Sequence, residues 1–181
     1  TIDPNVGVVP VPDNRLKKIA TIADSKQVIP ASVQFVDIAG LVAGASKGEG
    51  LGNKFLANIR ETQAILHVVR CFENTDVTHV SGKINPLSDI EVINTELALS
   101  DLESVQKLLA KLAKDAKRGD KEAKKFEALL IKAQDHLNEG KSLRALTLSD
   151  DEYDFLKQYQ FLTLKPILYV ANVDEEGLSG N

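Results

Sequence analysis

The chain has 181 residues, enough for one well-packed core, and an ordinary composition of 43% hydrophobic and 27% charged residues. The net charge of −4 provides no overall attraction to nucleic acid, and no segment is apolar for long enough to span a membrane. A single cysteine, Cys71, excludes an internal disulfide and fits a reducing compartment, so we expect a cytoplasmic protein with no membrane partner. Because the chain lacks methionine, we expect it to be a fragment whose natural start lies upstream of Thr1.

Strands and helices alternate in the pattern at both ends of the chain. Apolar, β-branched runs predict strands at residues 6–11, 33–37, 64–71 and 166–171. Helical spacing predicts short helices at residues 15–23 and 54–62, and the glycine-rich run 41–53 is expected to be a mobile loop. This order indicates an α/β fold with a mostly parallel sheet.

The middle of the chain follows a different pattern. Apolar residues recur every three or four positions over 89–118 and again over 126–137, with Gly119–Asp120 between them. Two amphipathic helices around a tight turn predict an antiparallel coiled-coil arm. We therefore divide the chain into a nucleotide-binding domain, first part (1–87), a helical coiled-coil insertion (88–148) and a second part of the nucleotide-binding domain (149–181).

The polar side of the predicted arm is rich in basic residues: Lys107, Lys111, Lys114, Lys117, Arg118, Lys121, Lys124 and Lys125. One interpretation is a solvated helical face. The other is a surface that binds RNA or a protein partner, which the concentration of charge near Gly119 favours. The sequence leaves both open.

The run from Phe35 to Gly40 ends a predicted strand in Asp37 and places a glycine three residues later. In nucleotide-hydrolysing switch proteins this D-x-x-G aspartate holds Mg²⁺ through water, and the glycine N–H approaches the γ-phosphate. An aspartate that ends a strand is also a common turn former. The glycine-rich run and the predicted helix that follow favour the switch segment.

A second polar segment, Asn172–Glu175, follows the last predicted strand. GTPases have N-K-x-D in this place, where the aspartate accepts hydrogen bonds from guanine N1–H and the 2-amino group. Here Val173 and Glu175 replace the lysine and the aspartate. Because adenine lacks both donors, the segment predicts a base-binding loop of altered specificity, against the alternative of a simple polar turn.

The run Gly140–Ser142 matches the end of a phosphate-binding P-loop but fails as one. The motif needs a glycine at position 135, which is Asp135, and it needs a strand before it rather than a helix. We expect a helix C-terminus at Gly140 instead. A little further on, Ser149 and Glu152 have the spacing of a capping box, which predicts the start of another short helix.

Two further residues bear on hydrolysis. Ras-like enzymes place a water-orienting glutamine directly after D-x-x-G, whereas Leu41 can neither donate nor accept a hydrogen bond. His79 lies in a polar stretch after the third predicted strand. A lone histidine in a loop usually has no special role, but this one could orient the attacking water.

Long runs of the sequence resemble the YchF family of P-loop NTPases, the Obg-like ATPases. The resemblance is carried by residues 1–9, 37–61, 67–73, 93–103 and 161–175. It implies a Ras-like core of the P-loop NTPase fold with an inserted coiled-coil arm. It also implies that the chain lacks the P-loop and the C-terminal TGS domain of that family.

The resemblance further implies roles for single residues. Thr1 resembles the switch threonine that joins the Mg²⁺ and γ-phosphate cluster, and Asp37 and Gly40 match the second switch. Leu41 matches the hydrophobic replacement of the catalytic glutamine, and His79 the histidine implicated in hydrolysis. Asn172, Val173 and Glu175 match the base loop that prefers ATP.

The function implied is that of a ribosome-associated switch ATPase that uses Mg²⁺ and hydrolyses ATP, and also GTP to some extent. The partners implied are ATP, the ribosome or its RNA, and proteins that contact the arm. The alternative is a nucleotide-gated RNA- or protein-binding module, in which the basic arm carries the function and hydrolysis only times release.

Overall fold

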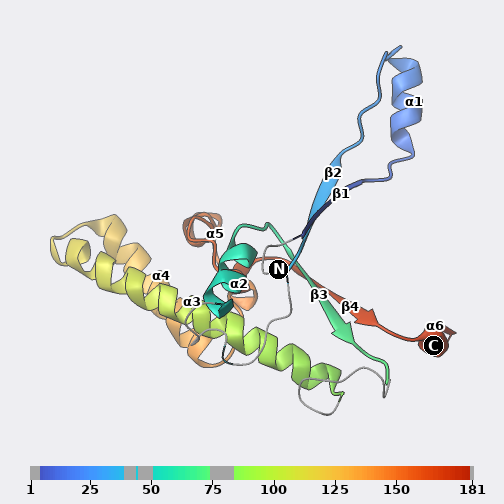
Figure 1. Ribbon diagram of the computed structural model, residues 1–181. Coiled ribbons are helices and arrows are strands. Elements are labelled where there is room, and N and C mark those ends of the chain that lie inside the picture. The colour runs from blue at the N-terminus through green and yellow to red at the C-terminus, as the bar shows by residue number, and fades with distance from the viewer. Residues whose placement is uncertain (1–4, 39–43, 45–50, 74–83, 180–181) are drawn as a thin grey trace. The chain divides into compact units, whose positions relative to one another are not determined.

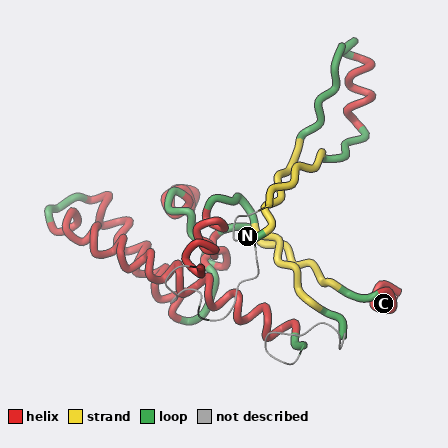
Figure 2. The backbone as a smooth tube through the Cα atoms, viewed as in Figure 1, coloured by secondary structure: helices red, strands yellow, loops and turns green. Residues whose placement is uncertain are grey.

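The computed structural model describes residues 5–38, 44, 51–73 and 84–179. The chain forms two compact units, residues 1–40 and residues 41–181. Figure 1 shows the elements in chain order and Figure 2 their types along the backbone. Within the described ranges, no helix combines the length and the apolar character needed to cross a membrane.

The first unit is a strand pair with a helix at its far end. β1 (Asn5–Pro10) and β2 (Ser32–Asp37) are antiparallel, with Asn5 opposite Asp37, and α1 (Arg15–Ile22) lies between them in sequence. The prediction of a mostly parallel sheet was wrong for this pair. The chain returns along β1 after α1. The Val11 N–H donates to the Ala31 carbonyl at 2.7 Å, which extends the antiparallel ladder by one more pair. Alternation of strands and helices in the sequence does not reveal such a return.

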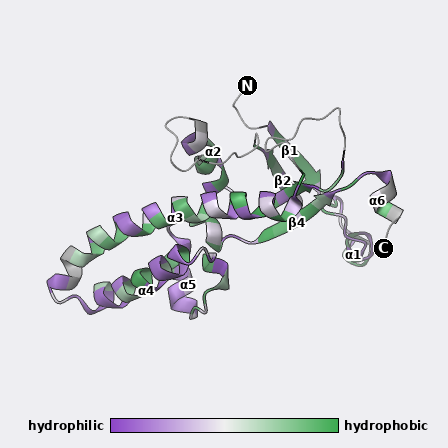
Figure 3. Cartoon of the chain, turned by 90° about the horizontal axis from the view of Figure 1, so that it is seen from below, coloured by the Kyte–Doolittle hydropathy of each residue, from purple (hydrophilic) through white to green (hydrophobic). Residues whose placement is uncertain are grey.

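The second unit contains a parallel pair, as the α/β pattern predicts. β3 (Ile65–Arg70) runs beside β4 (Ile167–Asn172), with Ile65 opposite Ile167 and Arg70 opposite Asn172. The described strands thus form two sheets of two strands each. Figure 3 shows the hydrophobic character of β4, which is typical of strands in α/β folds.

Two long helices form a helical hairpin in the middle of the chain. α3 (Pro86–Lys117) and α4 (Lys121–Asn138) lie side by side and antiparallel (Figure 1). Gly119 at the turn has φ +95°, and the Asp120 side chain accepts hydrogen bonds from the backbone N–H groups of Glu122 and Ala123. The hairpin agrees with the two expected helices. The coiled-coil packing and the division into three domain segments stay predictions.

The main core lies where this hairpin meets the segment that follows it. That segment consists of η1 (Leu143–Ala145), α5 (Asp150–Lys157) and η2 (Leu162–Leu164). The core is built from fully or almost fully buried side chains: Val105, Leu129, Leu130, Ala133, Leu137, Leu143, Phe155, Leu156 and Phe161.

The remaining helices are short. α6 (Glu175–Ser179) follows β4, and α2 (Leu51–Arg60) precedes β3. The mobile loop predicted over 41–53 was wrong at its end, because residues 51–53 already belong to α2. The spacing of Phe55, Leu56 and Ile59 sustains this helix, and Leu56 and Ile59 are buried.

Candidate nucleotide-binding site

The predicted base loop begins at the carboxyl end of the parallel strand pair. β4 ends at Asn172, and Cys71 just beyond β3 donates its N–H to the Asn172 carbonyl at 2.7 Å. A backbone hydrogen bond therefore holds Asn172, the last residue of β4, in place, and the residue is exposed to solvent. Ligands of open α/β folds bind at this end of the strands.

A tight turn holds the residues that follow. Asp174 is the N-cap of α6, since its Oδ1 accepts the Gly177 N–H at 2.8 Å. A Cβ added at Gly177 would lie 2.9 Å from the Cβ of Val173, so the helix packs closely against that residue. Val173 is half-buried and Glu175 is exposed. The structure therefore brings Asn172, Val173 and Glu175 together, with Val173 in a packing position.

Asp174 and Gly177 shape this loop, and neither was expected from the sequence to do so. A signal was present, because an aspartate one residue before a helix is a preferred N-cap. Gly177 has no side chain to collide with Val173, which lies close to it. This close approach is visible only in the three-dimensional structure.

Asp37 is the last residue of β2 and lies in the first unit, whereas the base loop belongs to the second. Its carboxylate is exposed and forms no hydrogen bond or ion pair with any residue that the structure describes. No group of three or more histidine, cysteine, aspartate or glutamate side chains in the described part of the chain could enclose a metal ion. A single free carboxylate does fit Mg²⁺, which protein sites commonly hold through one or two carboxylates, water and substrate phosphates.

Three other predicted site residues, Thr1, Gly40 and His79, lie outside the described residues, and so does Leu41. Their roles stay predictions. The rejected P-loop match at Gly140–Ser142 is indeed a helix end: Gly140 follows α4 with φ +74°, and its N–H donates to the Leu137 carbonyl at 2.9 Å.

A buried carboxylate on α3 joins this helix to the segment that leads into β4. Asp101 is fully buried, and its oxygens accept hydrogen bonds from Leu162 N–H at 2.9 Å and Thr163 N–H at 2.7 Å. The Thr163 hydroxyl donates to it as well, at 2.7 Å. Burial raises the pKa of the Asp101 carboxyl group, and the hydrogen bonds from Thr163 and Leu162 act against that rise.

Arg60, the last residue of α2, reaches the same place. Its guanidinium lies 3.7 Å from Asp101 and donates to the hydroxyl groups of Ser100 at 2.8 Å and Ser104 at 3.2 Å. Lys165 donates to the backbone carbonyls of Arg60, at 3.0 Å, and of Thr62. Burial, and next the charge of Arg60, lower the pKa of the Lys165 amine. α2, α3 and the start of β4 are thus tied by buried or half-buried polar contacts.

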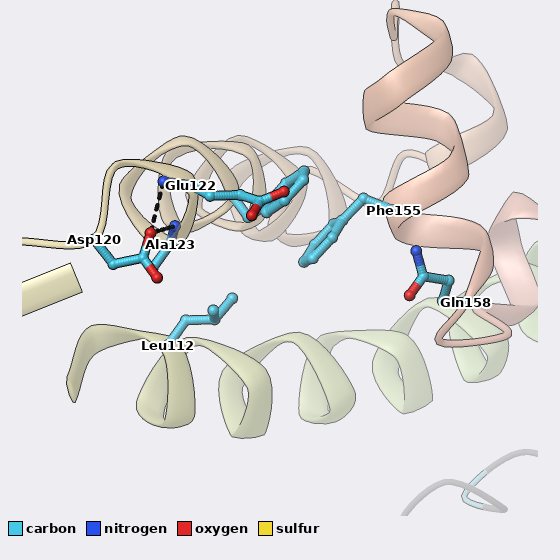
Figure 4. Close-up of a pocket in the computed structure, with 7 residues that line it drawn as sticks. Leu112, Asp120, Glu122, Ala123, Phe155 and Gln158 are labelled. Atoms are coloured by element: carbon cyan, nitrogen blue, oxygen red, sulfur yellow. Dashed lines mark hydrogen bonds between the residues drawn. The ribbon is translucent and has the colours of Figure 1, made fainter. Parts of the chain in front are cut away.

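A shallow hollow of about 340 Å³ lies at the other end of the unit, between α3, α4 and α5 (Figure 4). Leu112, Phe126 and Phe155 line it together with the capping residue Asp120. The Phe126 and Phe155 rings are stacked with centroids 3.8 Å apart, which fixes α5 to the hairpin. None of the predicted site residues lines this hollow, so it is separate from the base loop.

Comparison with known proteins defines first the class and then the family. A family model described as "50S ribosome-binding GTPase" matches residues 1–111, and with the α/β pattern it assigns a P-loop GTPase-like fold. Over its whole length the chain is 57% identical to "Ribosome-binding ATPase YchF" of Haemophilus influenzae and 56% identical to that of Escherichia coli O157:H7. The chain belongs to the YchF family.

Other relatives agree with this assignment. The Bacillus subtilis "Ribosome-binding ATPase YchF" is 49% identical over 184 residues. The solved structure of the Schizosaccharomyces pombe YchF GTPase matches with a TM-score of 0.79 and 36% identity, over 98% of this chain and 49% of that one. The chain spans about half the length of the curated relatives it matches, 50% for each of these three bacterial proteins.

Proposed function

We propose that the whole protein is a ribosome-associated switch ATPase that binds and hydrolyses ATP with Mg²⁺. The observation that carries this proposal is the exposed pair Asn172 and Glu175, held at the carboxyl end of the parallel strands in a chain 57% identical to a "Ribosome-binding ATPase". A glutamate at this position lacks the geometry of the guanine-binding aspartate. A protein that associates with ribosomes would work in the cytoplasm.

The phosphate side of the proposed site consists of Asp37, Thr1 and Gly40. Asp37 would hold Mg²⁺ through water, Thr1 would be a direct ligand, and the Gly40 N–H would contact the γ-phosphate. The exposed Asp37 carboxylate, without partners among the described residues, supports its part. Mg²⁺ supplies charge neutralisation at the phosphates when it is bound.

Because Leu41 cannot orient water, we propose that His79 does so. Replacing His79 with alanine is then expected to lower the turnover number while leaving the affinity for ATP close to its original value. Single-turnover measurements and ATP titrations on the full-length protein separate these two quantities. A His79→Ala variant that hydrolyses ATP at the parental rate would remove His79 from the mechanism.

Base selectivity tests the central part of the proposal. We expect the parent protein to prefer ATP over GTP in paired titrations and turnover assays. The double variant Val173→Lys, Glu175→Asp restores N-K-x-D and is expected to improve GTP binding by about tenfold or more, since the aspartate gains charge-assisted hydrogen bonds to guanine.

Val173→Lys alone is the matched control, because it keeps the Cβ that packs on Gly177 and adds no acceptor for guanine. It should leave the preference for ATP in place. A parent protein that clearly prefers GTP, or a double variant with no gain for GTP, would contradict the assignment of Glu175.

A second candidate function rests on the basic residues of the helical hairpin. Lys111, Lys117, Lys121 and Lys124 lie on it, and Lys121 and Lys124 are exposed. We propose that this surface, as part of a coiled-coil arm, contacts ribosomal RNA or a protein partner, with nucleotide controlling the contact. Here binding is the function and hydrolysis only sets its duration.

A further inference from the structure

α3 carries a row of polar side chains that are buried although they are not part of its apolar spacing. Glu96, Ser100 and Asp101 are 6%, 8% and 0% exposed, and Ser104 continues the row one turn later. Burial of a carboxylate is costly unless the group is hydrogen-bonded, so buried acids in such a row need partners. One of these partners, Gly44, precedes α2 in the sequence, and another, Arg60, is the last residue of α2.

Glu96 contacts Gly44, the one described residue between the D-x-x-G motif and α2. Its Oε1 accepts the N–H of Gly44 at 2.6 Å, a short bond of the charge-assisted type. Gly44 is four residues beyond Gly40 and has φ +85°, a conformation natural to glycine. α3 therefore fixes one particular backbone group near the proposed γ-phosphate contact in the sequence.

The same helix also contacts the end of α2. Arg60 donates to Ser100 and Ser104 and lies beside Asp101. Gly44 and Arg60 are thus both attached to one short stretch of α3. Because α3 continues as the first helix of the hairpin, the stretch that contacts Gly44 and Arg60 belongs to the same helix as part of the basic surface.

We propose that Glu96 is a positioning residue for hydrolysis and the point through which α3 couples nucleotide binding to the docking of the hairpin. The inference rests on the proposed function, since it needs both an ATPase and a ribosome contact. By linkage, a change in ribosome affinity caused by ATP requires an equal change in ATP affinity caused by the ribosome. Loss of the Glu96 bond should weaken both together.

The test uses the full-length protein with the variants Glu96→Ala and Glu96→Gln. The control is Glu91→Ala, which removes an exposed carboxylate from the same helix. We would measure ATP turnover, ATP affinity of the free protein, and ribosome affinity with and without a non-hydrolysable ATP analogue. The ratio of the two ribosome affinities reports the coupling.

Glu96→Ala is expected to lower turnover by about tenfold and to move the affinity ratio toward one, as the loss of a hydrogen bond to a charged acceptor implies. ATP affinity of the free protein should change by less than about twofold, since Glu96 is proposed to act through Gly44 and not on the nucleotide. Glu96→Gln should recover most of both losses, because its amide oxygen can accept the same N–H. Glu91→Ala should behave like the parent.

Several outcomes would overturn the inference. Parental turnover and coupling in Glu96→Ala would do so, and so would a Glu96→Gln variant as impaired as Glu96→Ala. If Glu96→Ala does not fold, the double variant Ser100→Ala, Ser104→Ala tests the Arg60 side, and unchanged coupling there would overturn it. A parent protein with no ATP turnover or no ribosome binding would instead refute the proposed function.

Discussion

At the residue scale, Asp101 is a buried carboxylate that joins α3 to the segment before β4. It is fully buried in α3 and accepts hydrogen bonds from Leu162 and Thr163, with Arg60 beside it. Once its carboxylate is removed, two backbone N–H groups and a partly buried guanidinium lose their shared acceptor. Removing one partner of a buried charged network is far more damaging than removing an exposed one.

We predict that Asp101→Ala lowers the free energy of unfolding by about 3–5 kcal/mol. Glu103→Ala, two residues along the same helix, should cost less than about 1 kcal/mol, because its ion pair with Lys107 is exposed. Urea unfolding of the two full-length variants, followed by circular dichroism, gives the comparison. Equal losses of stability would show that the buried network has no special weight.

The importance of Asp101 could not be foreseen from the sequence. An acidic residue in an otherwise apolar helical row was visible, but its acceptor role depends on Leu162 and Thr163, which are 61 and 62 residues further along the chain. The same holds for Glu96 and Gly44, which are separated by 52 positions. By contrast, the capping box of Ser149 and Glu152 was predicted and is confirmed, because all of its parts are local.

At the element scale, the helical hairpin has a basic surface that is only partly neutralised within the described part of the chain. Lys107 pairs with Glu103, and Lys125 lies 3.2 Å from Asp151. Lys121, just after the turn, and Lys124, one turn later, are exposed. Contacts between such lysines and RNA phosphates release counterions, so binding should fall steeply as salt rises.

We predict that the double variant Lys121→Glu, Lys124→Glu weakens ribosome binding and reduces its salt dependence by about two units of logarithmic slope, roughly one for each phosphate that is no longer neutralised. Lys17→Glu, Lys18→Glu on α1 is the matched control, since it reverses two exposed lysines on another helix. Binding titrations over a range of potassium chloride concentrations provide both numbers. Unchanged affinity and slope would mean that this face of the hairpin is merely solvated.

Element positions were largely predictable, whereas pairing directions were not. The spacing of apolar residues located α1, α3 and the end of α4 to within a few residues, whereas α4 begins at Lys121, ahead of the apolar pattern that starts at Phe126. It missed the first turn of α2 because Gly52 and the glycine-rich run before it looked like a loop. It also could not give the antiparallel direction of β1 and β2, which depends on how the chain between them returns.

At the scale of the whole molecule, sequence and structure agree on a P-loop GTPase-like α/β fold and on the YchF family. The family could be predicted from the sequence because long runs of residues match it. The similarity to the Haemophilus influenzae protein extends over 100% of this chain. The assembled nucleotide site was less accessible to prediction. Of its proposed residues, the structure describes Asp37 in one unit and Asn172, Val173 and Glu175 in the other.

The close packing at Gly177 has a consequence for the base loop. An added Cβ there would meet the Cβ of residue 173, which every amino acid except glycine carries, at 2.9 Å. The identity of residue 177 is therefore constrained by the turn, whichever base the loop accepts. In a protein that keeps this turn, residues 173 and 175 can therefore change with nucleotide preference, while a side chain at position 177 would force the backbone to shift.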